Sequence, residues 1–424
     1  DYDKELGEKD GFFEGMETTI LLNTINKIGS LMRVGFGEAG ASVIAENLKN
    51  SAGGRLNLMT GGRMITSIFG FCDVRQFTDT TECLQEEVML FVNRIGHILH
   101  NIVVQCSGSA NKNIGDAFLL TWKLEDDMPT EQMALLADQA LLTFCRALIE
   151  LSTYQDFICN FSAAANERLY KRFPGYLVRI GSGLHVGWAI EGAIGSNRKI
   201  DASYLSPHVN FTEFLESSTK AYGVPLLISE PFFKMLSPYS AKYIRNVDQI
   251  RKPGEDQLGL YTYDSDLALD WAQLRRATKN RTERRRSKGG ALDENNRKGR
   301  NRKNRQKDAL DENEGDVEEG SDGNNSKEIA PDIKVAKYKQ SVWEKDGELV
   351  QLRHMVYTNP EFRPMWDTGI AAYIAGDWPT AEHIFNDTLT MSGGKCGPSK
   401  FLLNEIKENG GIAPNDWPGY RLEE

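Results

Sequence analysis

The order of predicted strands and helices between residues 64 and 186 restricts this chain to very few folds. β-Branched and aromatic residues from Met64 to Val74 predict a strand, and apolar residues that recur every three or four positions from Leu84 to Ile102 predict a long helix. Two short strands, a helical region over 131–165 and a strand over 177–186 follow. This is the order of the ferredoxin-like βαββαβ unit. We therefore expect an α+β fold, in which an antiparallel sheet carries helices on one face.

Two local patterns sharpen this prediction. Asp79 and Glu82 are spaced as a capping box, which predicts the start of the first long helix. The strands over 110–114 and 117–122 flank Gly115 and Asp116, a pair typical of a tight turn. We expect these two strands to form a hairpin.

The chain as a whole divides into four predicted parts. Residues 1–62 form a lead-in with apolar residues at helical spacing, and residues 63–267 form the α+β domain. Residues 268–332 hold a basic run followed by an acidic run, which predicts a disordered linker; a basic patch for an anionic membrane surface is the alternative. Residues 333–424 carry the small and aromatic positions of one tetratricopeptide-like helical hairpin. Since a single repeat cannot bury its own faces, this region must pack on the α+β domain or on a partner protein.

Net charge and cysteine spacing argue against some classes of partner and compartment. The formal net charge of −10 argues against a nucleic-acid partner, because neutralising phosphates requires a basic face. The six cysteines are irregularly spaced without a C-x-x-C pair, which favours a reducing compartment over a disulfide framework or a zinc site. No apolar run reaches the length of a spanning helix, so we expect a cytoplasmic protein. The first residue is Asp1 rather than Met, which suggests a fragment of a parent protein that could be attached to a membrane.

Two acidic motifs lie where this fold would bring their carboxylates together. FGFCDVRQFTD places Asp73 at the end of the first strand, and NKNIGDAF places Asp116 in the hairpin turn. Because the two are neighbours in a ferredoxin-like sheet, both carboxylates could hold a pair of Mg²⁺ or Mn²⁺ ions over a triphosphate. Backbone N–H groups at the start of the next helix, including those of Phe77 and Thr78, suit the phosphates. Taken singly, each aspartate would be explained equally well as a helix cap or a turn residue.

Residues 62–264 resemble the catalytic domains of the class III adenylyl and guanylyl cyclases. The first motif is similar to the family's F-x-D-I-x-x-F-T, with Val74 in place of Ile, and the second is similar to its K-T-I-G-D hairpin, with Asn113 in place of Thr. The resemblance implies that Asp73, Asp116 and the carbonyl of Val74 bind two divalent ions in each site.

The resemblance also implies how the purine base is recognised. Lys112 falls on the base-reading position, and its partner would be Asp201 in RKIDASYLSPHVN. The ammonium would donate to adenine N1 and the carboxylate would accept from the exocyclic amine, a pattern that mismatches guanine. The spacing between Asp201 and Asn210 is two residues longer than is usual in the family, so this assignment requires a bulge or a longer loop. A solvated strand lysine is the alternative interpretation of Lys112.

The stretch SPHVNFTEFLE resembles the family's G-x-x-V-N-x-A-S-R-L-E helix. By this resemblance Asn210 orients the ribose, whereas Phe214 replaces an arginine that stabilises charge on the reacting α-phosphate. A phenyl ring cannot donate such hydrogen bonds. RKPGE resembles the family's V-K-G-K segment, which places Lys252 near the triphosphate. Arg198 and Lys199 are further candidates for phosphate contact, with surface loop residues as the alternative.

The family's sites form between two cyclase domains, so the resemblance implies a homodimer or a heterodimer. The leading hypothesis is an adenylyl cyclase, which converts ATP to cyclic AMP and pyrophosphate. Because of Phe214, a pseudo-cyclase that binds nucleotide or partners without turnover is the alternative. Guanylyl cyclase activity is the second possibility among enzymes.

Overall fold

The structure is a computed structural model that describes residues 18–31, 61–153, 160–196, 199–266, 338–353 and 355–423, with Gly35, Gly37 and Gly40. Within these residues, one sheet has the strand order β2-β3-β1-β4-β6-β8-β7-β9, and β5 pairs with β4. The strands are β1 Arg63–Val74, β2 Ser109–Ile114, β3 Ala117–Leu124, β4 Ile180–Ser196, β5 Lys199–Leu205, β6 Leu226–Ser229, β7 Ile244–Arg251, β8 Leu258–Tyr263 and β9 Arg421–Leu422. The helices are α2 Phe77–Leu84, α3 Val88–Gln105, α4 Thr130–Thr153, α5 Ala163–Arg172, α6 Pro207–Tyr222, α7 Glu230–Phe233, α8 Pro238–Ala241, α10 Val342–Lys345, α11 Gly347–Leu352, α12 Phe362–Ile374, α13 Trp378–Met391 and α14 Gly397–Glu408.

The predicted βαββαβ unit is confirmed. β1 pairs antiparallel with β3 on one side and with β4 on the other, and β2 pairs antiparallel with β3. The buried side chains of α3 and α4 pack on one face of β1, where Ile68 and Cys72 lie. The helix predicted over 131–165 is α4, which ends at Thr153, together with the start of α5. β6 then extends the sheet parallel to β4, so the complete sheet is mixed.

The helices of the βαββαβ unit cover one face of the sheet, as expected, whereas α6, which follows that unit, packs on the opposite face of β4. Leu184 of β4 joins the core beneath α3 and α4, while the alternating glycines of this strand face α6. A Cβ atom at Gly183 would lie 2.3 Å from the carbonyl oxygen of Thr212, and one at Gly187 would lie 2.2 Å from Cγ of His208. The glycines therefore allow α6 to approach the sheet closely.

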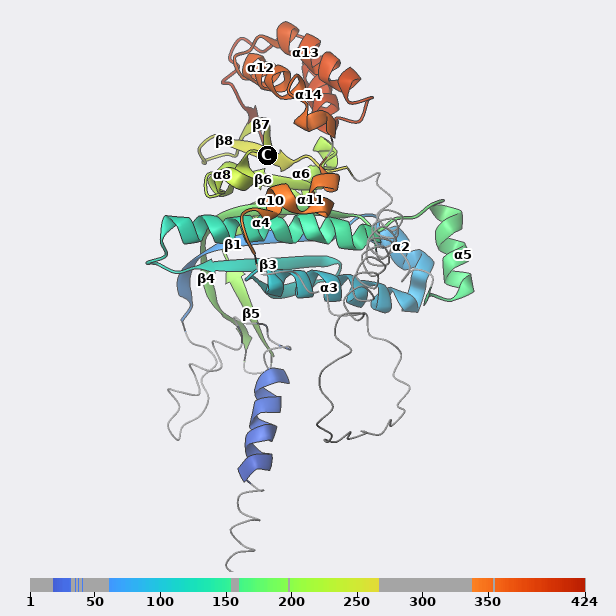
Figure 1. Cartoon of the computed structure of the whole chain (residues 1–424), viewed down its shortest axis with the longest axis vertical. Coiled ribbons are helices and arrows are strands. Elements are labelled where there is room, and N and C mark those ends of the chain that lie inside the picture. Colours follow the sequence, from blue (N-terminus) through green and yellow to red (C-terminus); the bar gives the residue numbers. More distant parts are fainter. Residues whose placement is uncertain are drawn as a thin grey trace, which may run out of the picture.

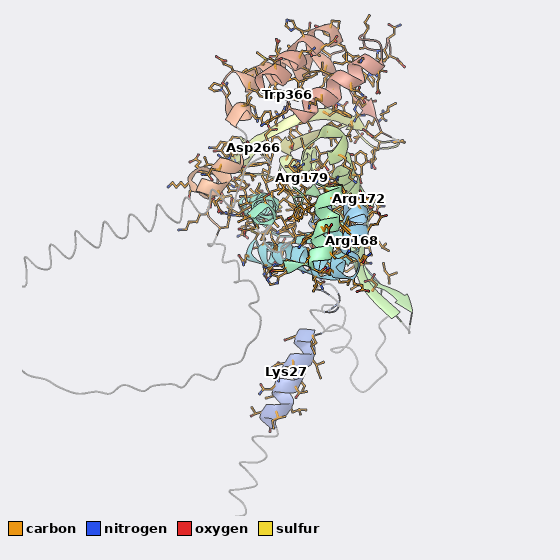
Figure 2. The ribbon with its side chains drawn as sticks, turned by 90° about the vertical axis from the view of Figure 1, so that its right-hand side faces the viewer. Lys27, Arg168, Arg172, Arg179, Asp266 and Trp366 are labelled. Carbon is orange, nitrogen blue, oxygen red and sulfur yellow. The ribbon has the colours of Figure 1, made fainter. Side chains whose placement is uncertain are left out.

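The predicted capping box is wrong. α2 begins at Phe77, and a turn at Gln85, whose φ is 54°, separates it from α3. Asp79 and Glu82 instead form ion pairs with Arg172 of α5, which is labelled in Figure 2. Both carboxylates, which the sequence spacing predicted to cap the helix, are therefore paired with a residue of another helix.

The hairpin of β4 and β5 folds over the face of β1 and β3 that α3 and α4 leave open. Its side chains build a second small core, in which the rings of Phe69 and Tyr204 have centroids 5.7 Å apart. Tyr204 also donates a hydrogen bond to Glu191 at 3.1 Å. This fold-over brings β5 toward β2, although the two strands are not adjacent in the sheet.

The C-terminal helices stand on the β7–β8 end of the sheet (Figure 1). Residues of α12, α13 and α14 share one buried core with α6, β7 and β8, and this core includes Trp366, Phe385 and Leu402. Figure 2 shows Trp366 at the base of these helices. Of the two predicted alternatives, the structure shows the hairpin packed on the α+β domain. Its tetratricopeptide-like kinship stays a prediction.

The N-terminal part is described only in pieces. Residues 18–31 are helical, as predicted for the lead-in, and lie apart from the rest of the described chain in Figures 1 and 2. The predicted linker over 268–332 lies outside the described residues. Among the helices that the structure does describe, none has the length and apolar character needed to cross a bilayer.

Candidate active site

The carboxylates of Asp73 and Asp116 meet at one end of the sheet, as the sequence predicts. Asp73 pairs in register with Ala117, the residue that directly follows Asp116. Gly115 has a φ of 65°, which permits the tight turn between β2 and β3. Burial, a hydrogen bond with Asp73 and the negative charge of that carboxylate together raise the pKa of Asp116 to about 6.

The donor atoms at this point suit a hard cation. No group of three or more His, Cys, Asp or Glu side chains in the described residues could hold a metal ion. A cation beside Asp73 and Asp116 would therefore need further oxygens from backbone, solvent or substrate, and Val74, the last residue of β1, offers its carbonyl in the same turn. This incomplete carboxylate set fits Mg²⁺, which keeps several ligands from water and phosphate.

Arg75 and Glu216 are part of this site and were missed by the sequence reasoning. Nη1 of Arg75 lies 2.8 Å from Oε1 of Glu216, whose side chain is 3% exposed, and Arg75 also donates to Thr219. Burial raises the pKa of Glu216; Arg75 opposes this shift, and Asp73 adds to it. The ion pair ties α6 to the turn after β1. The sequence signal was a glutamate six residues after Asn210 on the same predicted helix, but its partner could not be inferred from spacing.

The start of α2 presents its backbone beside the carboxylates. Gln76, the residue before the helix, has a φ of 59°, and Phe77 and Thr78 are the first helical residues. Within this described turn no side chain caps the helix. Because the first N–H groups of a helix have no intrahelical acceptor, they can donate to an anion.

Lys112 and Asp201 form an ion pair within one chain. Lys112 follows a register shift in β2, and Asp201 lies on β5 opposite Ile194 of β4. Their side chains are 33% and 46% exposed, so a ligand can reach both. β5 ends at Leu205, and α6, which carries Asn210, begins at Pro207.

Asn210, Phe214 and Lys252 form a second group, at α6. Asn210 and Phe214 are four residues apart and therefore share a helix face. Nζ of Lys252 lies 3.8 Å from the ring centroid of Phe214 and 4.9 Å from that of Phe211. Burial lowers the pKa of Lys252, while the charges of Glu255 and Glu423 oppose the shift. The structure thus brings a cation to the ring of Phe214.

The structure describes little of Arg198 and Lys199, the two remaining candidates for phosphate contact. Arg198 lies outside the described residues, and of Lys199 only the backbone, at the start of β5, is described. In the part of the chain that the structure describes, no hydrogen bond or ion pair joins Asp73 or Asp116 to Asn210 or Lys252.

Comparisons with known proteins match two regions of the chain. A family model of the all-helical domain of RasGEFs matches residues 2–49. An adenylate cyclase of Anabaena cylindrica is 28% identical over 194 residues, which are 44% of this chain and 34% of that protein. A terminal-differentiation-specific adenylate cyclase of Dictyostelium discoideum is 27% identical over 209 residues, 48% of this chain and 9% of that protein. A solved bacterial light-regulated adenylyl cyclase has a TM-score of 0.43 and 23% identity, covering 62% of this chain and 69% of that one.

Each match covers only part of the relative's length. The chain spans about a third of the Anabaena protein and less than a tenth of the Dictyostelium protein. The RasGEF match falls in the N-terminal part, of which the structure describes mainly the helix over 18–31.

Proposed function

We propose that this chain contains a class III cyclase domain and is an adenylyl cyclase, which converts ATP to cyclic AMP and pyrophosphate; its similarity to two adenylate cyclases supports this. The observation that carries the proposal is the meeting of the Asp73 and Asp116 carboxylates in the turn where β1 and the hairpin end. The pair of Lys112 and Asp201 supports it, because it offers a donor and an acceptor side by side.

Two Mg²⁺ or Mn²⁺ ions fit the oxygens of Asp73, Asp116 and the Val74 carbonyl. Hard divalent ions prefer such ligands and complete their shells with water and phosphate. Burial raises the pKa of Asp116, and the neighbouring Asp73 carboxyl group adds to the shift; a cation would relieve the repulsion between the two carboxylates. When bound, such ions acidify the ribose 3′ hydroxyl and neutralise charge on the leaving pyrophosphate.

The side chains and amides of this chain would bind and orient the nucleotide. The N–H groups of Phe77 and Thr78 donate to phosphate oxygens. Asn210 hydrogen-bonds the ribose region. Lys112 donates to adenine N1 while Asp201 accepts from the exocyclic amine; guanine presents a donor at N1 and an acceptor at O6, so both contacts would be mismatched.

Lys252 is the cation that we assign to the triphosphate, with Arg198 as a further candidate. The described residues give Lys252 no salt-bridge partner, and its ammonium rests on the rings of Phe211 and Phe214. A cation held by aromatic rings keeps its charge available to an anionic ligand.

We propose that a second cyclase domain completes each site. In a homodimer both sites would contain Phe214 in place of an arginine. In a heterodimer, Asp73 and Asp116 of this chain could act with an asparagine and an arginine from another domain. Removing one such donor typically lowers the rate by about 10²–10³, so the heterodimer would hold the faster site.

The decisive assay measures cyclic AMP from ATP with Mg²⁺ or Mn²⁺, using the purified chain alone and mixed with other cyclase domains. Asp73→Asn is the matched loss-of-metal control. Cyclic AMP formation that is absent from every mixture would contradict the proposal. Lys112→Glu should reduce the preference for ATP over GTP in a competition assay, and an unchanged ratio would remove the adenine assignment.

Phe214 supports one second candidate, a pseudo-cyclase that binds nucleotide without turnover. Its ring cannot donate a hydrogen bond to a phosphoryl oxygen. Nucleotide binding by the chain without product in any mixture would favour this candidate. A cytoplasmic location, and a protein partner for the C-terminal region, stay predictions that fractionation and affinity capture would test.

A further inference from the structure

The last described residues of the chain form part of the cyclase sheet. β9 pairs in parallel with the end of β7, with Ile250 opposite Arg421 and Arg251 opposite Leu422. The N–H of Glu423 donates to the carbonyl of Arg251 at 3.0 Å. Lys252 follows Arg251 directly, so the chain segment that carries this lysine is held on one side by β8 and on the other by β9.

The side chain of Arg421 connects this strand to α6. Nε lies 2.8 Å from Oδ2 of Asp248 on β7, and Nη2 donates to the hydroxyl of Tyr222 at 2.8 Å. Tyr222 is the last residue of α6 and donates to the same Asp248 oxygen at 2.5 Å. The side chain of Asp248 is fully buried. Losing one partner of a buried, hydrogen-bonded charge is costly, so this three-residue cluster fixes its elements firmly.

The same guanidinium also reaches the C-terminal helices. It lies 4.8 Å from the ring centroid of Phe401, and Nη1 is 3.8 Å from Oε2 of Glu405 on α14. The rings of Phe401 and Tyr222 are 4.2 Å apart. Arg421 is therefore the point where α14, the end of α6 and the end of β7 meet.

We infer that Arg421 and β9 position Lys252 and α6 for nucleotide binding, so that the C-terminal region is a built-in part of the site. The inference rests on the proposed function, because it takes Asn210 of α6 and Lys252 as nucleotide contacts. Displacement of β9 would release the segment after Ile250 from one of its two neighbouring strands, and a small misplacement of a charged contact is enough to weaken binding strongly.

The test measures the dissociation constant of 3′-deoxy-ATP, which lacks the attacking hydroxyl, for the full chain with Mn²⁺. Arg421→Met should raise this constant about tenfold or more, and Arg421→Lys should recover part of the loss through its remaining charge. Arg363→Met is the matched control. Nη2 of Arg363 donates to the carbonyl of Ile244 at 2.6 Å, so it anchors the same helices at the other end of β7. We expect it to lower stability and leave the constant within twofold.

A milder pair of variants covers the case in which Arg421→Met does not fold. Glu423→Pro removes the N–H that donates to Arg251, whereas Glu423→Ala removes only the side chain. Glu423→Pro should bind more weakly than Glu423→Ala and should speed hydrogen exchange over residues 250–257. The inference alone is overturned if the wild type binds 3′-deoxy-ATP, Arg421→Met binds it with the same dissociation constant as Arg363→Met, and Glu423→Pro with the same constant as Glu423→Ala. Failure of the wild-type chain to bind 3′-deoxy-ATP, both alone and mixed with other cyclase domains, would overturn the proposed function, and this inference with it.

Discussion

Asp116 works against the stability of the metal-free fold. Its pKa is raised to about 6 by burial, by the hydrogen bond with Asp73 and by the charge of that carboxylate. A carboxyl whose folded pKa lies above its unfolded value is harder to ionise in the folded state. The fold therefore carries a penalty above pH 6, and this penalty fades as the pH falls through 6 and is gone near pH 4.

Asp116→Asn should accordingly raise the melting temperature in EDTA at pH 8 and change it little at pH 4, while it removes cyclase activity. Thermal unfolding at the two pH values measures the first effect. Asp127→Asn, an exposed residue of the turn after β3, is the control and should show no such pH dependence. An Asp116→Asn variant that is less stable at pH 8 would contradict the interpretation.

Phe214 marks the position at which one substitution should increase activity. Arginine there would add a preorganised donor on the face of α6 that carries Asn210, and one such donor is typically worth about 10²-fold in rate. The neighbouring Lys252 will resist a second cation, so the gain should grow with ionic strength. Initial rates of cyclic AMP formation by Phe214→Arg, with Phe214→Leu as the control, measure this. Equal rates in both variants would show that the missing donor does not limit turnover.

At the scale of elements, α6 and β4 meet through two histidines. Nε2 of His185 lies 2.8 Å from Nδ1 of His208, and Nδ1 of His185 lies 2.7 Å from the hydroxyl of Ser229. Burial, and then the charges of the neighbouring His208 and Lys252, together lower the pKa of His185 to about 3. A neutral pair can share one proton between the rings, but a second proton would place two donors face to face.

This contact should make the fold sensitive to acid. Since the folded pKa of His185 lies below its unfolded value of about 6.5, the stability it contributes is complete above pH 6.5 and is lost as the pH falls toward 3. Between pH 6.5 and 5 the loss amounts to about 2 kcal/mol. Denaturant unfolding across this range should show the loss in the wild type and a smaller one in His185→Asn. His383→Asn, exposed on α13, should keep the wild-type pH dependence.

The periodicity of the sequence was sufficient to predict the helices and strands that each lie in one continuous segment. β1, the β2–β3 hairpin and α4 each carry a clear pattern, and the strand order then places Asp73 beside Asp116. The face on which α6 packs depends on Gly183 and Gly187, whose role appears only when helix and strand are in contact. β9 could not be predicted, because two residues have no periodicity and pair with a strand far away in the sequence.

At the scale of the whole molecule, a shared core joins the α+β domain to the C-terminal region. Arg245 of β7 is fully buried and forms two hydrogen bonds with Asp264, at 2.7 and 2.8 Å. Its guanidinium lies 4.1 Å from the ring centroid of Trp366 and 4.8 Å from that of Tyr357. Sequence reasoning anticipated that the helical region needed a packing partner, but a buried arginine among aromatic residues gave no local sign of where it would dock.

Because this core belongs to both parts, they should unfold in one transition, and Arg245→Met should move that transition as a whole. The variant leaves the largely buried carboxylate of Asp264, whose side chain is 9% exposed, without its partner, and breaking a buried pair in this way typically costs about 3–5 kcal/mol. The double variant Arg245→Met with Asp264→Leu should recover much of this loss, since the unpaired charge rather than the lost attraction carries most of the cost. Calorimetry together with tryptophan fluorescence measures both effects, because Trp366 and Trp378 report on the C-terminal helices while Trp122 reports on the sheet. Two separate transitions, with only the tryptophan signal of the C-terminal helices shifted, would show that the region is an independent domain and that the shared core adds little stability to the sheet.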